Sequence, residues 1–433
     1  MIKYLESEVM IIDLSYTLKS ELKAAIKELG FKEFTEIQKL VLDKISQKAS
    51  IIAESQTGSG KTHAFLFPLF NEMDLTINKV QSVIIAPTKE LVNQIAGFAE
   101  QINKHFLNNF KILILKGGSD RLREIEKIRK NYYHLVIATP GKLFDYCVKE
   151  GILNISTASY LVIDEADMAL DLGFIPEMQE IIAKIKDKRL FLFSATLPEQ
   201  IKSFIKKIVK NQEFIHLKAD DFQSLLISHN FIKIKNEVNK DKNLLELIGA
   251  INPYLCLIFA NTNEETARLA KVLKQESINV VALHSDIDKR VRKKIMDKID
   301  KLEYQYVVCS DICARGIDIK GVSHVVNFEL PKDFAFYLHR TGRTGRAKMS
   351  GESYSFYSHN ALGYPQELRA KGVSVNFAEI KNQEIRILTR EKEIESEPTI
   401  VKVKPKTKRV APNYKKKIAE KKKKSNKKES RKR

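Results

Sequence analysis

Short apolar runs alternate with longer amphipathic stretches along most of the chain. Runs that are apolar at nearly every position suit strands buried on both faces of a parallel sheet, and the stretches between them suit helices. In the first half we expect helices such as 124–130 and 177–185 between strands at 50–55, 82–87, 111–118, 134–140, 160–167, 189–196 and 213–217. In the second half we expect strands at 230–235, 255–262, 279–286, 304–311 and 324–331. The pattern predicts an α/β fold with parallel sheets.

The strand rhythm pauses at "KADDFQSLLISH" and then resumes, so the pattern predicts two α/β units in tandem that meet near residues 218–228. We expect a first unit at 1–217, a linker at 218–228, a second unit at 229–380 and a tail at 381–433.

The predicted strands end in small, polar or charged residues, namely Pro87, Gly117, Thr139, Asp164, Ser194, Asn261, His284 and Asp311. In open α/β sheets, ligands bind at the carboxyl ends of the strands. These residues should therefore line one face of each unit, and two such faces can oppose each other across a cleft. His284 alone is as well explained by a structural hydrogen bond as by a working role.

The stretch "SQTGSGKT" follows a predicted strand and should open a helix. Gly58 and Gly60 let backbone N–H groups approach phosphate oxygens, Lys61 reaches the β and γ phosphates, and the Thr62 hydroxyl is a ligand for Mg²⁺. Ser55 stands where the general phosphate-loop pattern has glycine, which leaves an ordinary glycine-rich turn as the alternative. The GKT ending and the strand-loop-helix context favour a phosphate-binding loop. His63, the next residue, is expected on the helix surface.

The stretch "LVIDEADMAL" supplies the acids that such a loop needs. Asp164, at the end of a buried strand, is placed to hold Mg²⁺ through water, and Glu165 to orient or deprotonate the attacking water. Alone, these acids would more often cap a helix N-terminus. Phosphoryl transfer also benefits from a cation beside the developing charge on the γ-phosphate. No arginine in these two stretches plays that part, whereas "HRTGRTGR" far downstream, residues 339–346, holds three.

Composition indicates the number of domains and the cellular compartment. The chain has 433 residues, of which 43% are apolar, enough for two or three domains with buried cores. Its four cysteines lack the paired spacing of a zinc site or a disulfide framework. The N-terminus lacks a signal-peptide layout, and no apolar run approaches the ~20 residues that span a bilayer. We expect a soluble, cytoplasmic protein that does not contact membranes.

The net charge of +20 is concentrated at the C-terminus. From Val401 to Arg433 there are 17 Lys or Arg and two acids, a net charge of +15, which leaves +5 for the first 400 residues. Such a segment repels itself and has too few apolar residues to fold alone. It is either a solubilising end or an RNA tether, and counterion release favours the tether in a protein that binds nucleic acid.

The ordered motifs from about Leu14 to about Tyr357 resemble those of the DEAD-box RNA helicases, most closely the bacterial cold-shock-type members. "GFKEFTEIQ" is similar to the Q motif, which begins near residue 11 and ends near residue 39. "SQTGSGKT", "PTKEL", "TPGKL", "DEAD" and "SAT" are similar to motifs I, Ia, Ib, II and III. "LIFANT", "SDICARGID" and "HRTGRTGR" are similar to motifs IV, V and VI.

The resemblance implies two RecA-like domains, the cofactors ATP and Mg²⁺, and RNA as partner. Gln38 would read the adenine edge, Thr35 would support the phosphate loop, and Asp318 would touch the ribose. The implied ATP-binding residues are Phe31, Gln38, Ser55, Gln56, Thr57, Gly58, Ser59, Gly60, Lys61, Thr62, Gly316 and Asp318. The implied catalytic residues are Lys61, Asp164, Glu165, Arg343 and Arg346, the two arginines acting as fingers once the domains close.

In the same family, ATP state is coupled to RNA through contacts between the domains. The implied coupling residues are Asp167, Ser194, Ala195, Thr196, His339 and Arg340, with His339 contacting Asp167. The implied RNA-binding residues are Pro87, Thr88, Lys89, Gly117, Gly118, Thr139, Pro140, Gly141, Thr262, Arg292, Ser310 and Asp311. Most are small or present their backbone, which suits contact with phosphates and 2′-hydroxyls rather than bases.

Some positions depart from the family pattern. Phe34 replaces the usual proline, and Asp13 stands where an aromatic stacks on adenine, a role that Tyr16 is placed to take over. Lys89 and Lys142 replace arginines and so lose the bidentate fork to phosphate. In "HSDIDKRVR" the usual glycine and glutamine are replaced by Ser285 and Lys289.

The leading hypothesis is an RNA-dependent ATPase that unwinds short duplexes, in ribosome assembly or RNA turnover. A nucleotide-gated RNA clamp and, more weakly, a DNA helicase are the alternatives. The basic tail is a candidate contact for protein partners as well as for RNA.

Overall fold

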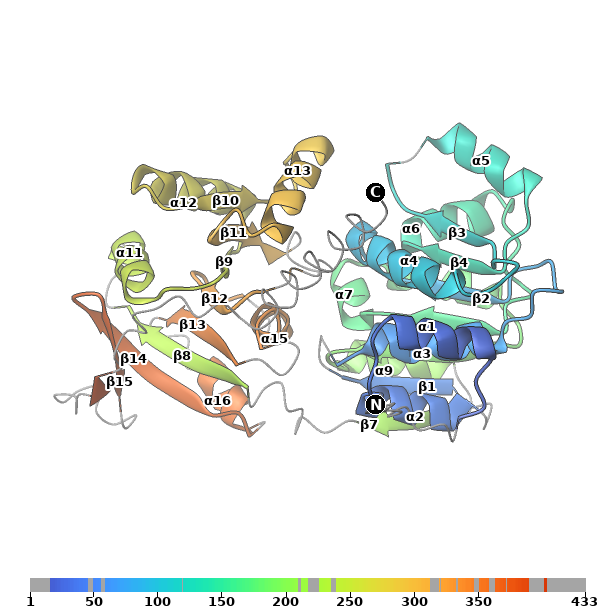
Figure 1. Cartoon of the computed structure of the whole chain (residues 1–433), viewed down its shortest axis with the longest axis horizontal. Helices are drawn as coiled ribbons and strands as arrows, with labels where there is room; N and C mark the ends of the chain where they lie inside the picture. Colours follow the sequence, from blue (N-terminus) through green and yellow to red (C-terminus); the bar gives the residue numbers. More distant parts are fainter. Residues whose placement is uncertain are drawn as a thin grey trace, which may run out of the picture. The chain divides into compact units, whose positions relative to one another are not determined.

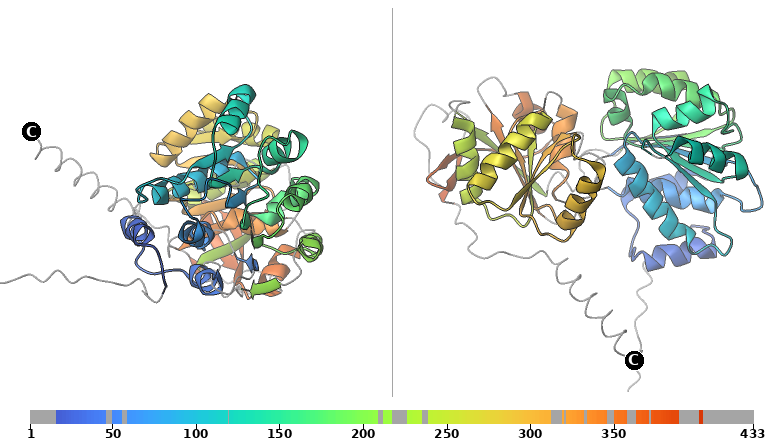
Figure 2. Two further views of the ribbon diagram at one scale, coloured as in Figure 1. Left: turned by 90° about the vertical axis from the view of Figure 1, so that its right-hand side faces the viewer. Right: turned by 90° about the horizontal axis from the view of Figure 1, so that it is seen from above.

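The computed structural model describes residues 16–45, 50–55, 59–118, 120–208, 212–216, 226–234, 239–311, 319, 321–331, 334–345, 350–357, 363–370, 372–388 and 401–402. The chain forms two compact units, Met1–Lys218 and Ala219–Arg433. Figure 2 shows that the helices of each unit lie on both sides of its own sheet. Within the described residues, no helix is long and apolar enough to cross a membrane.

The described part of the first unit contains a sheet of seven strands, all parallel (Figure 1). Their order across the sheet is β3 (Ile112–Leu115), β4 (Leu135–Ala138), β2 (Ser82–Ile85), β5 (Tyr160–Ile163), β6 (Arg189–Ser194), β1 (Ser50–Glu54) and β7 (Gln212–His216). All seven strands expected in the first half are therefore present. Parallel pairing places the carboxyl ends of all seven strands at one edge of the sheet.

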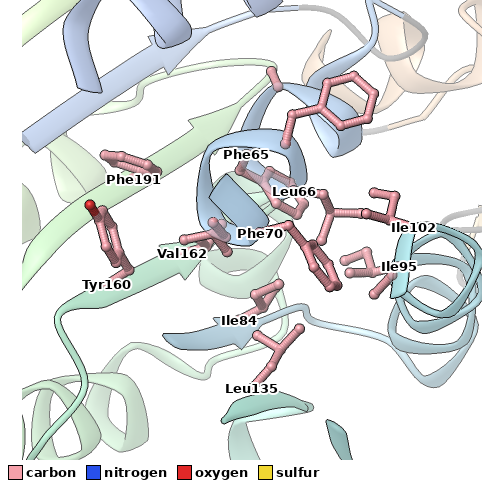
Figure 3. Packing of buried hydrophobic residues seen from close by; sticks show 14 of the residues in the cluster. Phe65, Leu66, Phe70, Ile84, Ile95, Ile102, Leu135, Tyr160, Val162 and Phe191 are labelled. Atoms are coloured by element: carbon pink, nitrogen blue, oxygen red, sulfur yellow. The ribbon is translucent and has the colours of Figure 1, made fainter. Parts of the chain in front are cut away.

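The helices of the first unit cover both faces of this sheet. They are α1 (Ser20–Glu28), α2 (Glu36–Ile45), α3 (Lys61–Glu72), α4 (Lys89–Asn103), α5 (Arg121–Lys130), α6 (Pro140–Phe144), α7 (Ala166–Asp171), α8 (Ile175–Ala183) and α9 (Glu199–Ile208), and a π-helical turn follows α6 at Asp145–Lys149. On one face, α1 to α4 contribute to a single hydrophobic core; Figure 3 shows side chains of α3 and α4 meeting those of β2, β4, β5 and β6. On the other face, α6, α8 and α9 contribute to a second core.

The described part of the second unit contains a sheet of nine strands. Their order is β10 (Val280–Leu283), β11 (Tyr306–Ser310), β9 (Cys256–Ala260), β12 (His324–Asn327), β13 (Gly351–Tyr357), β8 (Ile227–Lys233), β14 (Val375–Lys381), β15 (Glu384–Leu388) and β16 (Val401–Lys402). The pairs β14–β15 and β15–β16 are antiparallel, and the other pairs are parallel.

The helices of the second unit also lie on two faces. They are α11 (Lys240–Ala250), α12 (Asn263–Gln275), α13 (Lys289–Asp300), α15 (Phe334–Thr341) and α16 (Gly363–Ala370). α11 and α12 contribute to the core on one face, and α13 to the core on the other. The five strands expected in this half are β8 to β12. β8 begins at Ile227, inside the stretch expected to be linker, and β15 and β16 lie inside the stretch expected to be tail.

Candidate functional site

The order of the strands divides the carboxyl edge of the first sheet into two halves. The loops after β5, β6 and β1, which are neighbours, carry Asp164, the "SAT" stretch and the phosphate loop. The loops after β3, β4 and β2, also neighbours, carry the candidate RNA-binding residues of this unit. The sheet thus groups two sets of residues that are interleaved along the sequence.

The phosphate loop leads directly from β1 into α3. Gly60 has φ +94°, a conformation that favours glycine, and directly precedes the helix. The Lys61 ammonium is buried and donates to the Ser55 carbonyl over 2.6 Å, and the Ser55 hydroxyl bonds to that of Ser59 over 2.6 Å. Gln56, Thr57 and Gly58, predicted members of this loop, lie outside the described residues. The Lys61 ammonium therefore bridges the two ends of the loop by its hydrogen bond to the Ser55 carbonyl.

The Q-motif residue Gln38 is tied to this loop rather than standing apart from it. Its side-chain oxygen accepts from the Thr35 N–H over 2.9 Å, and its amide donates to the Gly60 carbonyl over 3.1 Å. A Cβ placed on Gly60 would lie 2.7 Å from the Gln38 Nε2 and 3.0 Å from the Thr35 Oγ1. The structure thus brings Thr35, Gln38 and the phosphate loop together, while the role of Gln38 toward adenine stays a prediction.

The aromatic residues beside this motif form a connected group. The Phe31 ring meets Phe67 and His63 edge-on, at centroid distances of 5.3 and 4.9 Å. The expectation that His63 lies on the helix surface is wrong, because it packs among these rings, and burial lowers its pKa to about 4. Tyr16 packs edge-on against Phe34, with ring centroids 6.0 Å apart.

The acidic pair lies at the carboxyl end of β5. Asp164 is 3% exposed, and burial raises its pKa to about 7 although the Lys61 charge opposes the shift. Glu165 has φ +49°, a strained conformation for a residue with a side chain, of a kind that persists mainly at functional sites. Its Oε2 is buried and makes no hydrogen bond within the described structure. A buried acid pair with an unsatisfied oxygen and a neighbouring lysine fits a bound Mg²⁺ with its waters.

Asp167, two residues beyond this pair, joins β5 to the "SAT" stretch. The Thr196 N–H and hydroxyl donate to the Asp167 Oδ2 over 3.0 and 3.1 Å, and the Asp167 N–H donates to the Ser194 hydroxyl over 3.0 Å. Asp167, Ser194 and Thr196, three of the residues predicted to couple the state of ATP to RNA binding, therefore form one hydrogen-bond network. Ala195 lies between two of them in the sequence.

The candidate RNA-binding loops of the first unit meet at neighbouring strand ends. The Thr88 hydroxyl caps α4 by accepting from the Leu91 N–H over 3.2 Å. The Lys89 side chain lies over Gly117, because a Cβ on that glycine would be 2.9 Å from the Lys89 Cε. Gly118 has φ +98°. The remaining predicted members, Pro87, Thr139, Pro140 and Gly141, follow β2 and β4 at the same edge.

Sequence reasoning missed how Lys142 is held. Its ammonium donates to the Glu124 carboxylate over 2.9 Å, and the Tyr146 hydroxyl donates to the same oxygen over 2.6 Å. Both charged side chains are largely buried. The network ties α6 to α5, so Lys142 positions the loop after β4. No signal in the sequence singled out Glu124, because α5 carries a second acid, Glu126.

In the second unit, Arg340 is the centre of a buried polar network. It is 2% exposed, and its guanidinium forms a bidentate pair with Asp311 over 2.5 and 2.7 Å. It also donates to the Asn261 side chain over 2.8 Å and to the Glu329 carbonyl over 2.5 Å. Asp311, predicted to bind RNA, thus has both carboxylate oxygens engaged by Arg340 inside the unit. The pairing joins the loops after β9, β11 and β12 to α15.

A second network joins the loops after β9, β10 and β11. The Ser310 hydroxyl donates to the Asn263 carbonyl oxygen over 3.0 Å, and the Asn263 amide donates to the Ser285 hydroxyl over 2.5 Å. Thr262 caps α12 through a bond of 3.1 Å from the Glu265 N–H. Asn263 was not singled out from the sequence, because nothing in the sequence indicates that it contacts Ser310 and Ser285.

The other predicted residues of the second unit are only partly described. His339 is buried and lies in α15. Arg343 is also buried and lies just beyond the end of that helix. Arg292 lies on the half-buried face of α13. Arg346, Gly316 and Asp318 lie outside the described residues. Cys309 is buried in the core, and the described residues contain no group of three His, Cys, Asp or Glu suited to a metal.

The two sheets, the phosphate loop and the buried acids define a RecA-like enzyme that uses a nucleoside triphosphate. The family model described as DEAD/DEAH box helicase matches residues 35–204, and that described as Helicase conserved C-terminal domain matches residues 239–348. The chain belongs to the DEAD-box helicase family.

Among its relatives, the DEAD-box ATP-dependent RNA helicase CshB of Bacillus subtilis is 38% identical over 96% of this chain and 97% of its own length. The protein of that name in Listeria monocytogenes is 37% identical over 94% of this chain and 96% of its own. A solved structure, S. cerevisiae Dbp5 bound to RNA and ADP BeF3, is 26% identical, has a TM-score of 0.75 and covers 84% of this chain and 94% of its own.

Proposed function

We propose that this chain binds RNA with both units, locally separates the strands of short duplexes and hydrolyses ATP to release the RNA. Its family makes it an ATP-dependent RNA helicase. The observation that carries the fuller proposal is the strand order of the first unit. The acids, the "SAT" stretch and the phosphate loop follow the adjacent strands β5, β6 and β1, and the candidate RNA-binding loops follow another adjacent set, β3, β4 and β2.

The loops after β5, β6 and β1, which we call the nucleotide half of the sheet edge, suggest a separate role in ATP hydrolysis for each of their predicted residues. Lys61 is placed to neutralise the β and γ phosphates, and Thr62 and Asp164 would hold Mg²⁺, Asp164 through water. The metal would neutralise phosphate charge when bound. Glu165, whose buried Oε2 makes no hydrogen bond to described residues, would accept a proton from the attacking water or orient it.

The remaining predicted contacts complete this proposal. Arg343 and Arg346 would stabilise charge on the γ-phosphate when the units close, and His339 would contact Asp167. RNA would be held by its backbone, because the candidate loops present small residues, N–H groups and a lysine rather than groups that read bases. Such binding is largely independent of sequence.

The basic tail would tether the RNA. β16 (Val401–Lys402) pairs with β15, so truncation for this test should begin after Lys402 to keep the strand. Removing the tail should weaken binding to RNAs of any sequence, with a loss of ~0.7 in the salt slope for each single-strand phosphate contact. An unchanged slope would leave the tail as a solubilising or protein-binding end.

The direct test is ATP turnover with and without single-stranded RNA and, in parallel, with DNA. RNA should stimulate turnover and DNA should not. The Glu165→Gln variant should retain ATP and RNA binding and lose turnover. The matched control is Glu177→Gln in α8, which also has a buried Oε2 without a hydrogen bond to described residues but lies outside the nucleotide half. No stimulation by RNA, or full turnover by Glu165→Gln, would contradict the proposal.

The cellular substrate is proposed from the relatives alone. Resemblance to cold-shock helicases supports a role in ribosome assembly or RNA turnover, with ribosomal precursors or messenger RNA bound. Crosslinking the protein to RNA in cells and sequencing the bound fragments distinguishes these substrates. Strong ATP-dependent retention of RNA with feeble duplex separation would instead support a clamp.

A further inference from the structure

Outside the tail, α13 has the highest net charge of the described helices. α13 (Lys289–Asp300) carries six basic and two acidic residues, a net charge of +4, whereas the first 400 residues together carry only +5. Nothing in the ATP chemistry requires this charge, since the only residue of α13 in the predicted sites is Arg292.

The basic residues of α13 divide between its two faces. Ile295, Met296 and Ile299 pack toward the core, and Arg292 lies on the same half-buried side. The opposite side exposes Arg290, Lys293, Lys294 and Lys298 together with one acid, Asp297, and Val291 is 49% exposed among them. We call these four cations the outer face of α13.

Most of the outer face is not neutralised by local ion pairs. No ion pair joins Arg290, Lys293 or Lys294 to another described residue, and Lys298 pairs with Glu303 over 3.6 Å. The other strongly basic helix, α5, differs in this respect. Three of its five cations form ion pairs, Arg121 with Glu150, Arg123 with Asp120 and Lys130 with Glu126. Exposed, unpaired cations are free to exchange counterions for phosphates.

The outer face begins at the edge that carries the candidate RNA-binding residues of the second unit. α13 follows β10, the edge strand, and β11 and β9 are the next strands in the sheet (Figure 1). The loops after these three strands are joined by the bonds among Ser285, Asn263 and Ser310. A strand of RNA that leaves these loops on the β10 side therefore meets α13 first.

We propose that the outer face of α13 is a second RNA-binding surface, which holds the phosphate backbone of the strand after it leaves the strand-end loops of this unit. This inference rests on the proposed function. Recognition is electrostatic and independent of base sequence, because the outer face contains no aromatic side chain for stacking. The surface lengthens the bound segment of RNA beyond the residues implied by the motifs.

The test compares two double variants of the full chain. Lys293→Gln with Lys294→Gln removes two charges from the outer face, and glutamine preserves helix propensity. Lys271→Gln with Lys274→Gln is the control, because these exposed lysines lie in the second half of α12, away from the strand ends. Binding is measured across a salt series with single-stranded RNA of two lengths. The shorter, about 6 nucleotides, is meant to occupy the strand-end loops alone, and the longer, about 30 nucleotides, to reach α13 as well.

The outer-face variant should lower the salt slope for the longer RNA by ~1.4, two contacts at ~0.7 each, so the ratio of Kd at fourfold higher salt to Kd at low salt shrinks about sevenfold. The control should change neither value, and ATP turnover without RNA should be the same in both. An unchanged slope, an equal drop in the control, or an equal defect with the shorter RNA would overturn the second surface. Failure of the proposed function is recognised separately, by unmodified protein that RNA does not stimulate.

Discussion

Removing one partner of the buried bidentate pair of Arg340 and Asp311 should destabilise the second unit far more than removing one partner of an exposed bidentate pair. Arg340→Met leaves the Asp311 carboxylate, 17% exposed, without its guanidinium partner. Breaking a buried pair by removing one partner costs about 3–5 kcal/mol, because the remaining charge stays desolvated. The same variant also removes the donors to Asn261 and to the Glu329 carbonyl.

The second unit contains its own control for this prediction. Arg268 forms a bidentate pair with Asp241 over 2.6 and 2.8 Å, but its side chain is 44% exposed. An exposed ion pair contributes about 0–1 kcal/mol, so Arg268→Met should be nearly neutral. Arg268 also pairs with Glu265 over 2.7 Å, so each variant removes a guanidinium with more than one partner, and the exposure of that guanidinium is the main difference between them.

Hydrogen exchange is the suitable assay, because the chain contains no tryptophan and its two units complicate a single unfolding curve. Since ~1.4 kcal/mol corresponds to a factor of ten, Arg340→Met should reduce protection of β9 and β11 by roughly two to four orders of magnitude. Protection of β5 in the first unit serves as the internal reference. Arg340→Met combined with Asp311→Leu should recover part of the loss. Equal effects of Arg340→Met and Arg268→Met would refute the reasoning.

Three further outcomes follow from individual contacts. Gly60→Ala should abolish ATP binding measured by calorimetry, because its Cβ would lie 2.7 Å from the Gln38 Nε2 and its φ is +94°. Burial lowers the pKa of His229 to about 4, so between pH 6.5 and 4 only the unfolded chain takes up this proton. The unfolding free energy of the second unit should therefore fall by about 1.4 kcal/mol per pH unit on acidification, and a His229→Phe variant should lose this component. Glu124→Gln, which weakens the hold on Lys142, should raise the RNA concentration for half-maximal ATP turnover and leave RNA-independent turnover unchanged.

The sequence predicted β8 to β12 of the second unit but not the strands that follow them, and β13 shows one physical reason. β13 (Gly351–Tyr357) carries Ser353 and Ser355 at 0% exposure in the centre of the sheet. The Ser355 hydroxyl accepts from the Asn327 amide over 2.9 Å, so the serine is satisfied by a residue of the neighbouring strand. Hydrophobic periodicity cannot reveal a strand whose buried positions depend on such partners.

The candidate site shows the same limit. The phosphate loop and the acids were predicted from short sequence motifs, because the residue types within each motif indicate its chemistry. The links between them were not, because Gln38 and Gly60 lie 22 residues apart and Asp311 and Arg340 lie 29 apart. The division of the sheet edge into a nucleotide half and an RNA half depends on strand order, which adjacent sequence does not specify.

The family resemblance implies a coupling role for Arg340 of "HRTGRTGR" and a catalytic one for Arg343 and Arg346, and the structure adds a physical reason for separating Arg340 from the other two. Arg340 has its charge matched by Asp311 within its own unit, so it is not available to stabilise a phosphate. If the segment supplies charge to ATP, that charge must come from Arg343 or Arg346. Guanidinium groups stay charged at any working pH, so their effect on the γ-phosphate is controlled by distance alone.

Arg343→Ala should therefore reduce RNA-stimulated ATP turnover by about 10³-fold or more, the effect expected of an arginine finger, while leaving ATP affinity and the exchange protection of β9 and β11 unchanged. Arg340→Met should instead reduce the exchange protection of β9 and β11, and any loss of turnover should follow from that loss of stability. Normal turnover by Arg343→Ala combined with Arg346→Ala at saturating RNA would exclude this segment from the chemistry. Loss of protection in Arg343→Ala as large as in Arg340→Met would show that both arginines serve the fold.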